Sequence, residues 1–150
     1  IKFKKNSFTG ITGESGSGKS TLIDLIMGVI NQKSGVINLD NIPINNIVRD
    51  WQHSIGYVDQ NIFITNGSIK KNIAFGVDAK DLNFGAVENA SKIANIHDFI
   101  TEELPKKYQT KIGERGIRLS GGQRQAIALA RSILRKPKIL VLDEKFSYLL

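Results

Sequence analysis

The sequence predicts an α/β fold with a parallel sheet, and three stretches of the chain carry that prediction. A glycine-rich stretch, Gly13 to Ser20 (GESGSGKS), stands between a strand pattern and a helix pattern. The continuous apolar run Ile139 to Leu142 (ILVL) is typical of a parallel strand covered on both faces. From Ser68 to about Pro137 strand signals fade and helical patterns take over. With 150 residues and 41% hydrophobic content, the chain is expected to form one compact unit that contains a helical lobe.

The glycine-rich stretch fits the P-loop pattern, which is a glycine, four residues and then Gly-Lys-Ser. We expect Ser7 to Thr12 to run as a strand into this loop and Thr21 to Ile30 to follow it as a helix. The glycines allow positive φ and bring backbone N–H groups close to phosphate oxygens, and the helix N-terminus adds partial positive charge. The alternative is a glycine-rich turn that opens an ordinary helix.

The P-loop pattern also assigns roles to individual residues. Lys19 is expected to reach the β- and γ-phosphates of a nucleotide, and the hydroxyl of Ser20 is expected to hold Mg²⁺. The predicted nucleotide-binding residues are Gly13, Glu14, Ser15, Gly16, Ser17, Gly18, Lys19, Ser20 and Thr21.

The segment after the first helix predicts short strands. Val36 to Ile44 alternates polar and apolar residues and is expected to form an edge hairpin. Trp51 is interpreted as a packing anchor and not as a functional residue. Ile55 to Val58 is expected to be a buried strand that places Asp59 and Gln60 at its C-terminal end, where open α/β sheets contact ligands.

Helical patterns fill the next part of the chain, and a second glycine turn opens the last of them. Leu119 to Gln123 (LSGGQ) is that turn, so Ser120 and the backbone N–H groups of Gly121 and Gly122 are expected to form another anion site. Two separated phosphate-binding turns in one chain indicate that two chains share two nucleotides. The expected helices are Ser68 to Phe75, Phe84 to Asn95, His97 to Ile100 and Gln123 to Arg135.

Asp143 and Glu144 follow the apolar run at the end of a predicted buried strand. Acidic groups there are costly unless they meet a cation. Beside a phosphate-binding loop, Asp143 can hold Mg²⁺ through water, and Glu144 can orient the attacking water or accept its proton. The alternative is that both are surface residues at a strand end.

Composition narrows the function classes. The formal net charge of +7 is compatible with nucleotide phosphates, nucleic acid or an anionic membrane face. The lysines occur in short scattered pairs without the aromatic residues of a single-strand binding surface, so an ordinary solvated surface accounts for them. Cysteine is absent, which excludes disulfides and cysteine-ligated metals and fits a reducing compartment.

Four motifs, GESGSGKS, GYVDQ with Gln60, LSGGQ and ILVLDE, follow one another in an order that resembles the nucleotide-binding domain of ABC transporters. The resemblance covers roughly Asn6 to Glu144, and LSGGQ is its most specific motif. It implies a P-loop NTPase (RecA-like) core with a parallel sheet and an inserted ABC-type helical subdomain. The implied core lobe is about 1–66 and 137–150, and the implied helical lobe is about 67–136.

The resemblance also implies the site. It makes Gln60 the Q-loop glutamine, Ile139 to Asp143 the Walker B strand and Glu144 the catalytic glutamate, with ATP and Mg²⁺ as cofactors. The implied catalytic residues are Glu144, Gln60 and Lys19, and the implied metal ligands are Ser20, Gln60 and Asp143. The signature residues that contact the partner's ATP are then Leu119, Ser120, Gly121, Gly122 and Gln123.

The implied partners are a second nucleotide-binding domain and a membrane-spanning domain. In the implied head-to-tail dimer, Ser120 and Gly122 of one subunit contact the γ-phosphate held by Lys19 of the other. The stretches FITNGSIKKNIAFG and TKIGERG resemble the exporter branch, in which Glu114, Arg115 and Gly116 lie near the coupling helices. The implied function is ATP hydrolysis that powers export, at the cytoplasmic face of the cell membrane.

Departures from the family pattern keep two alternatives open. The chain reads DEKFSYLL where the family continues DEATSALD, Asp59 stands near the usual place of a proline, and Ala126 stands where arginine is common. The domain is expected to continue beyond both ends, with the adenine-stacking aromatic residue before Ile1 and the switch histidine after Leu150. One alternative is a truncated module that binds nucleotide without turnover. The other is a soluble ABC ATPase acting on nucleic acid, against which the exporter-like GERG stretch argues, so no nucleic-acid partner is expected.

Overall fold

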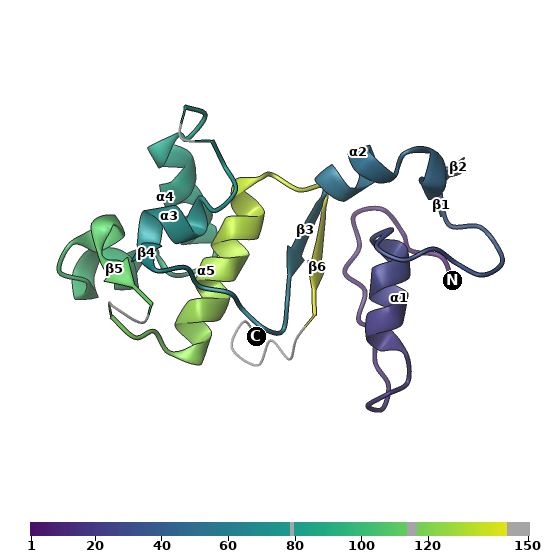
Figure 1. Cartoon of the computed structure of the whole chain (residues 1–150), viewed down its shortest axis with the longest axis horizontal. Helices are drawn as coiled ribbons and strands as arrows, with labels where there is room; N and C mark the ends of the chain where they lie inside the picture. The colour runs from purple at the N-terminus through teal and green to yellow at the C-terminus, as the bar shows by residue number, and fades with distance from the viewer. Residues whose placement is uncertain (79, 114–116, 144–150) are drawn as a thin grey trace. The chain divides into compact units, whose positions relative to one another are not determined.

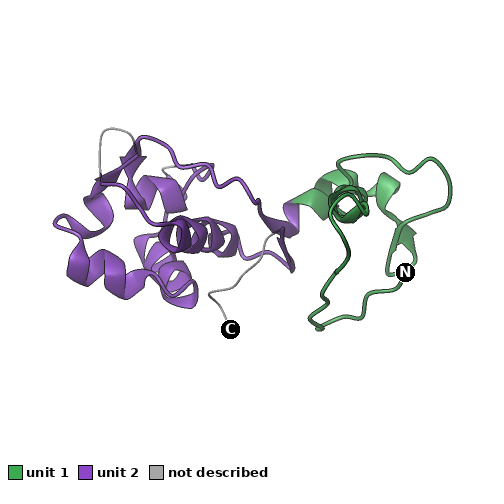
Figure 2. Cartoon of the chain, turned by 90° about the horizontal axis from the view of Figure 1, so that it is seen from below, with its two compact units in different colours: residues 1–52 green, residues 53–150 purple. Residues whose placement is uncertain are grey.

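A computed structural model describes residues 1–78, 80–113 and 117–143 of the chain. The chain divides into two compact units, Ile1–Gln52 (unit 1) and His53–Leu150 (unit 2), which are coloured separately in Figure 2. Within the described ranges, no helix combines the length and the apolar character needed to cross a membrane. The predicted division into a core lobe and a helical lobe stays a prediction.

Unit 1 contains one main helix and a short hairpin (Figure 1). The two strands of the hairpin pair antiparallel, and the turn residues Asp40 and Asn41 have φ values of 47° and 73°. Asp and Asn tolerate this left-handed conformation better than most residues, so they suit a tight hairpin turn. The predicted hairpin over 36–44 is confirmed. The elements are α1 (Lys19–Ile26), β1 (Asn38–Leu39), β2 (Ile42–Pro43), the 3₁₀ helix η1 (Ile44–Asn46) and α2 (Val48–His53), which ends at the start of unit 2.

A small core and a glycine define the C-terminal end of α1. Trp51 Nε1 donates to the carbonyl oxygen of Ile26 at 2.7 Å, which confirms Trp51 as a packing anchor and satisfies a carbonyl that the helix leaves unpaired. Gly28 has φ of 68°, and the N–H of Val29 donates to the carbonyl oxygen of Asp24 at 2.9 Å. This is a Schellman ending, so α1 stops at Ile26 and not at the predicted Ile30. The buried apolar residues of unit 1 are Ile23, Met27, Ile44 and Trp51.

The predicted strand over Ser7 to Thr12 is wrong for unit 1. These residues carry no strand assignment, and Phe8 is 95% exposed. A strand depends on ladder hydrogen bonds to a neighbour. The only sheet within residues 1–52, all of which the structure describes, is the β1–β2 hairpin. The alternating pattern therefore lacks a partner strand in this unit.

Unit 2 packs its helices around α5. The predicted helices around α3, α4 and α5 are confirmed, although α5 starts at Gly121 and not at Gln123. The predicted helix over 97–100 appears as a helical turn that continues into η2. The elements are β3 (Ile55–Val58), β4 (Gly67–Ser68), α3 (Ile69–Ile73), α4 (Phe84–Ile93), the π-helix η2 (Phe99–Glu103), the 3₁₀ helix η3 (Lys107–Gln109), β5 (Lys111–Ile112), α5 (Gly121–Leu134) and β6 (Ile139–Leu142).

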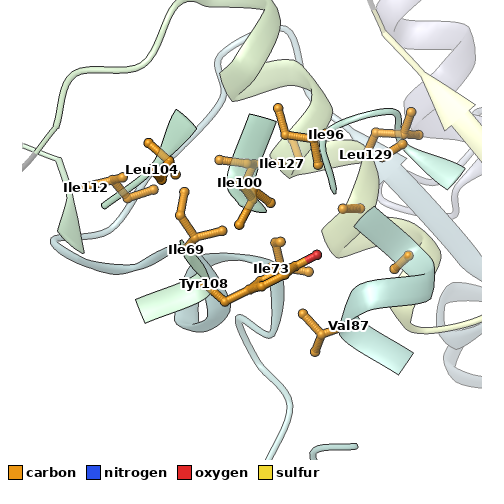
Figure 3. Packing of buried hydrophobic residues seen from close by; sticks show 14 of the residues in the cluster. Ile69, Ile73, Val87, Ile96, Ile100, Leu104, Tyr108, Ile112, Ile127 and Leu129 are labelled. Atoms are coloured by element: carbon orange, nitrogen blue, oxygen red, sulfur yellow. The ribbon is translucent and has the colours of Figure 1, made fainter. Parts of the chain in front are cut away.

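The core of unit 2 is apolar and continuous (Figure 3). Ile69 and Ile73 from α3, Val87 from α4, and Ile127 from α5 are fully buried within it. Tyr108 from η3 also enters the cluster, and burial, above all other causes, raises the pKa of its hydroxyl. Burial of several such side chains supplies most of the stability of a unit this size. The core therefore fixes α5 and with it the LSGGQ turn.

The strands β3 and β6 form at the positions predicted from their apolar runs, and they pair with each other in parallel. Ile55 lies opposite Ile139 and Val58 lies opposite Leu142. The expectation that β6 is covered on both faces is wrong, because Ile139 and Leu140 are 39% and 40% exposed. The sheet containing β6 has only two strands in the described part of the chain, so β6 has a neighbour on one side only.

Candidate functional site

The P-loop wraps around the ammonium group of Lys19. Lys19 Nζ donates to the carbonyl oxygens of Gly13 at 2.8 Å and Glu14 at 2.6 Å, and it lies 3.5 Å from Ser17 Oγ. The loop is also closed by Ser17 N, which donates to the carbonyl oxygen of Glu14 at 3.2 Å. A methyl group built on Gly13 would lie 2.8 Å from Ser17 Oγ, so a larger residue there would have to displace the Ser17 hydroxyl. The loop thus holds a positive charge at the start of α1.

The first turn of α1 has no side-chain cap. Its N-cap residue is Gly18, in the left-handed conformation with φ of 89°. The first N–H groups of any helix lack an intrahelical acceptor, and Gly18 brings no side chain to supply one. Together with the helix dipole and the ammonium of Lys19, these N–H groups have the chemistry of the predicted anion site. Ser20 and Thr21 are exposed in this same turn.

The LSGGQ turn opens α5 with a capping box. Ser120 Oγ accepts a hydrogen bond from Gln123 N at 3.2 Å, and Ser120 N donates to Gln123 Oε1 at 2.8 Å. The side chain of Gln123 therefore folds back onto its own turn. Built Cβ atoms on Gly121 and Gly122 meet nothing within 4 Å, so their backbone is accessible. The signature turn is a second, more rigid place for an anion.

Gln60 lies next to the signature turn within unit 2. The exposed Gln60 and Phe63 line one side of a hollow of about 490 Å³, and Gly121 and Arg124 of α5 line the other. The chain turns away from β3 just before this point, where Asp59 Oδ1 accepts a hydrogen bond from Asn61 N at 2.7 Å. The structure thus brings Gln60 and the start of α5 together.

Asp143 extends from the end of β6 and is held by β3. Asp143 N donates to the carbonyl oxygen of Val58 at 3.0 Å, and the hydroxyl of Tyr57 donates to Asp143 Oδ2 at 3.2 Å. Asp143 and Gln60 therefore follow the carboxyl ends of two neighbouring parallel strands, where α/β sheets place their ligand contacts. Tyr57 is a neighbour of the site that the sequence patterns did not reveal.

The oxygen donors suit Mg²⁺. Ser20 offers a hydroxyl, Gln60 an amide oxygen and Asp143 a carboxylate, which are hard ligands of the kind Mg²⁺ takes together with phosphate oxygens. Among the residues that the structure describes, no group of three or more His, Cys, Asp or Glu side chains could hold a metal ion. Ser20 belongs to unit 1, and Gln60 and Asp143 belong to unit 2. Each of the three side chains carries an oxygen donor of the type that a metal bound together with phosphate takes.

Some predicted residues lie outside the described ranges. Glu144, the predicted catalytic glutamate, is one of them, and so are Glu114, Arg115 and Gly116. Their roles stay predictions.

Arg131 is a residue of this region that sequence reasoning missed. Its side chain leaves α5 half-buried and donates to the main-chain oxygens of Asn72 and Phe63. Burial, with a smaller contribution from the charge of Arg135, lowers the pKa of Arg131 below its ordinary value. A signal was present in the sequence, since Arg131 shares a helix face with the apolar Ile127.

A family model described as ABC transporter matches residues 1–147. The chain belongs to the ABC transporter family. It is an ATP-binding domain of the exporter type, as the motif order and the two exporter-like stretches, FITNGSIKKNIAFG and TKIGERG, indicated. A solved structure of a bacterial Atm1-family ABC exporter with ATP bound is 37% identical, with a TM-score of 0.79, over 91% of this chain and 24% of that one.

Relatives from distant organisms support the same family assignment. ABC transporter B family member 1 of Dictyostelium discoideum is 43% identical over 150 residues, which are 99% of this chain and 16% of that protein. A Rickettsia bellii protein, named as a candidate export ATP-binding/permease protein, is 46% identical over 152 residues, or 99% of this chain and 26% of that protein. This chain therefore spans about a quarter or less of the length of these relatives.

Proposed function

We propose that this ABC domain binds Mg·ATP at its P-loop and hydrolyses the ATP to power export across a membrane. The observation that carries the proposal is the P-loop itself, where the ammonium of Lys19 and the uncapped first turn of α1 lie together. Membership of the ABC transporter family supports it.

The proposed chemistry is in-line attack of water on the γ-phosphate. Lys19 and the first-turn N–H groups bind the β- and γ-phosphates, and Gln60 orients the attacking water. Glu144 accepts the proton of that water, and ADP and phosphate leave. Ser20, Gln60 and Asp143 would hold Mg²⁺, which when bound neutralises charge on the phosphate oxygens. Positioning and electrostatic stabilisation supply most of the rate.

The proposed site is completed by a second nucleotide-binding domain, in a homo- or heterodimer. Residues 119–123 of one domain contact the γ-phosphate held by Lys19 of the other, so two domains share two nucleotides. The accessible backbone of Gly121 and Gly122 at the start of α5 supports this. The proposed location is the cytoplasmic face of the cell membrane, bound or fused to a membrane-spanning domain.

The test is steady-state phosphate release by the transporter that contains this chain. Glu144→Gln is expected to lower kcat by about a hundredfold or more, the effect of losing a general base, while the Kd for ATP stays within about twofold. Glu102→Gln, on the exposed end of η2, is the matched control and should keep full activity. ATP binding without phosphate release by the wild type would identify a module without turnover. A rate that rises severalfold with DNA or RNA would favour a nucleic-acid ATPase.

A further inference from the structure

One arginine joins α5 to the chain that follows Gln60. Arg131 Nε donates to the carbonyl oxygen of Asn72 at 2.8 Å, and Nη2 donates to the carbonyl oxygen of Phe63 at 3.0 Å. The guanidinium lies over the ring of Phe75, 5.3 Å from its centroid, and that ring packs edge-on against Phe63 at 6.2 Å. The planar fork of Arg131 therefore holds two separate points of the backbone between β3 and α4, which passes α5 in Figure 1.

The buried side chain of Asn72 extends this connection. Asn72 Oδ1 accepts a hydrogen bond from Thr65 N at 2.8 Å, and Nδ2 donates to the carbonyl oxygens of Thr65 at 3.0 Å and Ser68 at 3.1 Å. The Asn72 side chain itself has an exposed fraction of 0%, and its hydrogen bonds are partly shielded from water, which strengthens them. Asn72 thereby joins Thr65 and Ser68 to α3, and Arg131 joins Asn72 and Phe63 to α5.

The two ends of this connection are the two functional segments of unit 2. Phe63 follows Gln60 closely, and both line the hollow beside Gly121. The other end, α5, begins at the LSGGQ turn, whose capping box fixes the turn to the helix. A helix carries displacement along its length as one hydrogen-bonded body. A movement of the Gln60 segment therefore has a direct mechanical route to Ser120.

We propose that Arg131 is a positioning residue that couples the Gln60 segment to the signature turn through α5. The inference rests on the proposed function. Arg131 acts through its contacts with the main chain at Phe63 and Asn72, by keeping Ser120 and Gly122 in a fixed position relative to Gln60 when ATP is bound. Lysine is a poor substitute, because its single ammonium lacks the planar fork that matches two carbonyl oxygens.

The test compares ATPase kinetics of variants in the transporter that contains this chain. Arg131→Ala is expected to lower kcat about tenfold, because small misplacements far from the chemistry slow it strongly, and to leave KM for ATP within about twofold. Arg131→Lys should retain an intermediate kcat. Arg135→Ala is the matched control, since Arg135 is exposed one turn later on α5 and makes longer contacts, 3.4 Å and 3.5 Å, to Phe75 and Gly76. Its kcat should stay within about twofold of wild type.

A double-mutant cycle with Gln60 separates coupling from a merely structural role. If Arg131 acts through the Gln60 segment, Arg131→Ala adds less than about twofold to the loss caused by Gln60→Ala. The inference is overturned if the losses in kcat multiply in the double variant, or if Arg135→Ala loses as much kcat as Arg131→Ala. If Arg131→Ala does not fold, Arg131→Lys replaces it in the double-mutant cycle. If the wild-type transporter hydrolyses ATP no faster than the Lys19→Ala variant, the proposed function is overturned as well. If the wild type is active and the losses in kcat of Arg131→Ala and Gln60→Ala multiply in the double variant, only the coupling is overturned.

Discussion

The two glycine turns of the chain each open a helix, but they treat its first turn differently. At α1, Gly18 has φ of 89° and supplies no cap. At α5, Ser120 and Gln123 satisfy each other in a capping box. The two turns thus give one helix start without a side-chain cap and one in which a capping box satisfies part of the first-turn donors. The P-loop depends on an external anion, whereas the signature turn is stable by itself.

This difference indicates which turn binds ATP first. An anion at the P-loop gains several uncommitted N–H groups and the ammonium of Lys19, so it is held strongly. The signature turn offers the hydroxyl hydrogen of Ser120 and the N–H groups of its glycines, which is enough for a second contact on a phosphate already held elsewhere. The comparison fits a site shared between two domains, and substitutions at four positions, Lys19, Ser120, Gly18 and Gly121, can test it.

The largest expected effect is at Lys19. Lys19→Ala should raise the Kd for ATP by the equivalent of about 1.5 to 3 kcal/mol, the range for hydrogen bonds to charged groups. Equilibrium binding of ATP measures it, with Lys33→Ala, an exposed lysine of unit 1, as the control. An unchanged Kd would refute the assignment of the P-loop.

Ser120 is expected to show a smaller effect, and on local stability. Ser120→Ala removes the cap and should destabilise the first turn of α5 by about 1 kcal/mol, whereas Ser120→Asp keeps an N-cap acceptor and should restore it. Hydrogen exchange of residues 120–125 reports this local opening. Ser120→Asp should still impair ATP-driven dimerisation, because its carboxylate repels a phosphate. Normal dimerisation of that variant would argue against a phosphate contact at Ser120.

The smallest effects come from one substitution made at both turns. Gly18→Ala should destabilise by about 1 kcal/mol, because alanine is strained at positive φ. Gly121→Ala should stabilise by up to about 0.5 to 1 kcal/mol, because Gly121 is helical and glycine is a poor helix residue. A methyl group meets nothing within 4 Å at either position, so new packing contacts do not contribute to the change in stability. If the thermal unfolding midpoints of Gly18→Ala and Gly121→Ala shift in the same direction, the proposed difference between the two turns is contradicted.

The sequence predicted the elements whose signals are local. The runs at Ile55 to Val58 and Ile139 to Leu142 became β3 and β6 without a shift of boundary, and the hairpin and α5 also formed. The predicted strand at Ser7 to Thr12 was wrong because a strand needs a partner, which a local pattern does not supply. Arg131 was missed for a related reason, since its acceptors are main-chain oxygens 59 and 68 positions away.

The closed P-loop has a kinetic consequence. An ammonium has three hydrogens to donate, and Lys19 directs them at three oxygens of its own loop. An arriving phosphate must displace at least one of these contacts before Lys19 can turn to it. For the proposed binding of ATP, association is therefore an exchange of hydrogen-bond partners for Lys19. When the phosphate leaves, the same loop oxygens are again available to the ammonium.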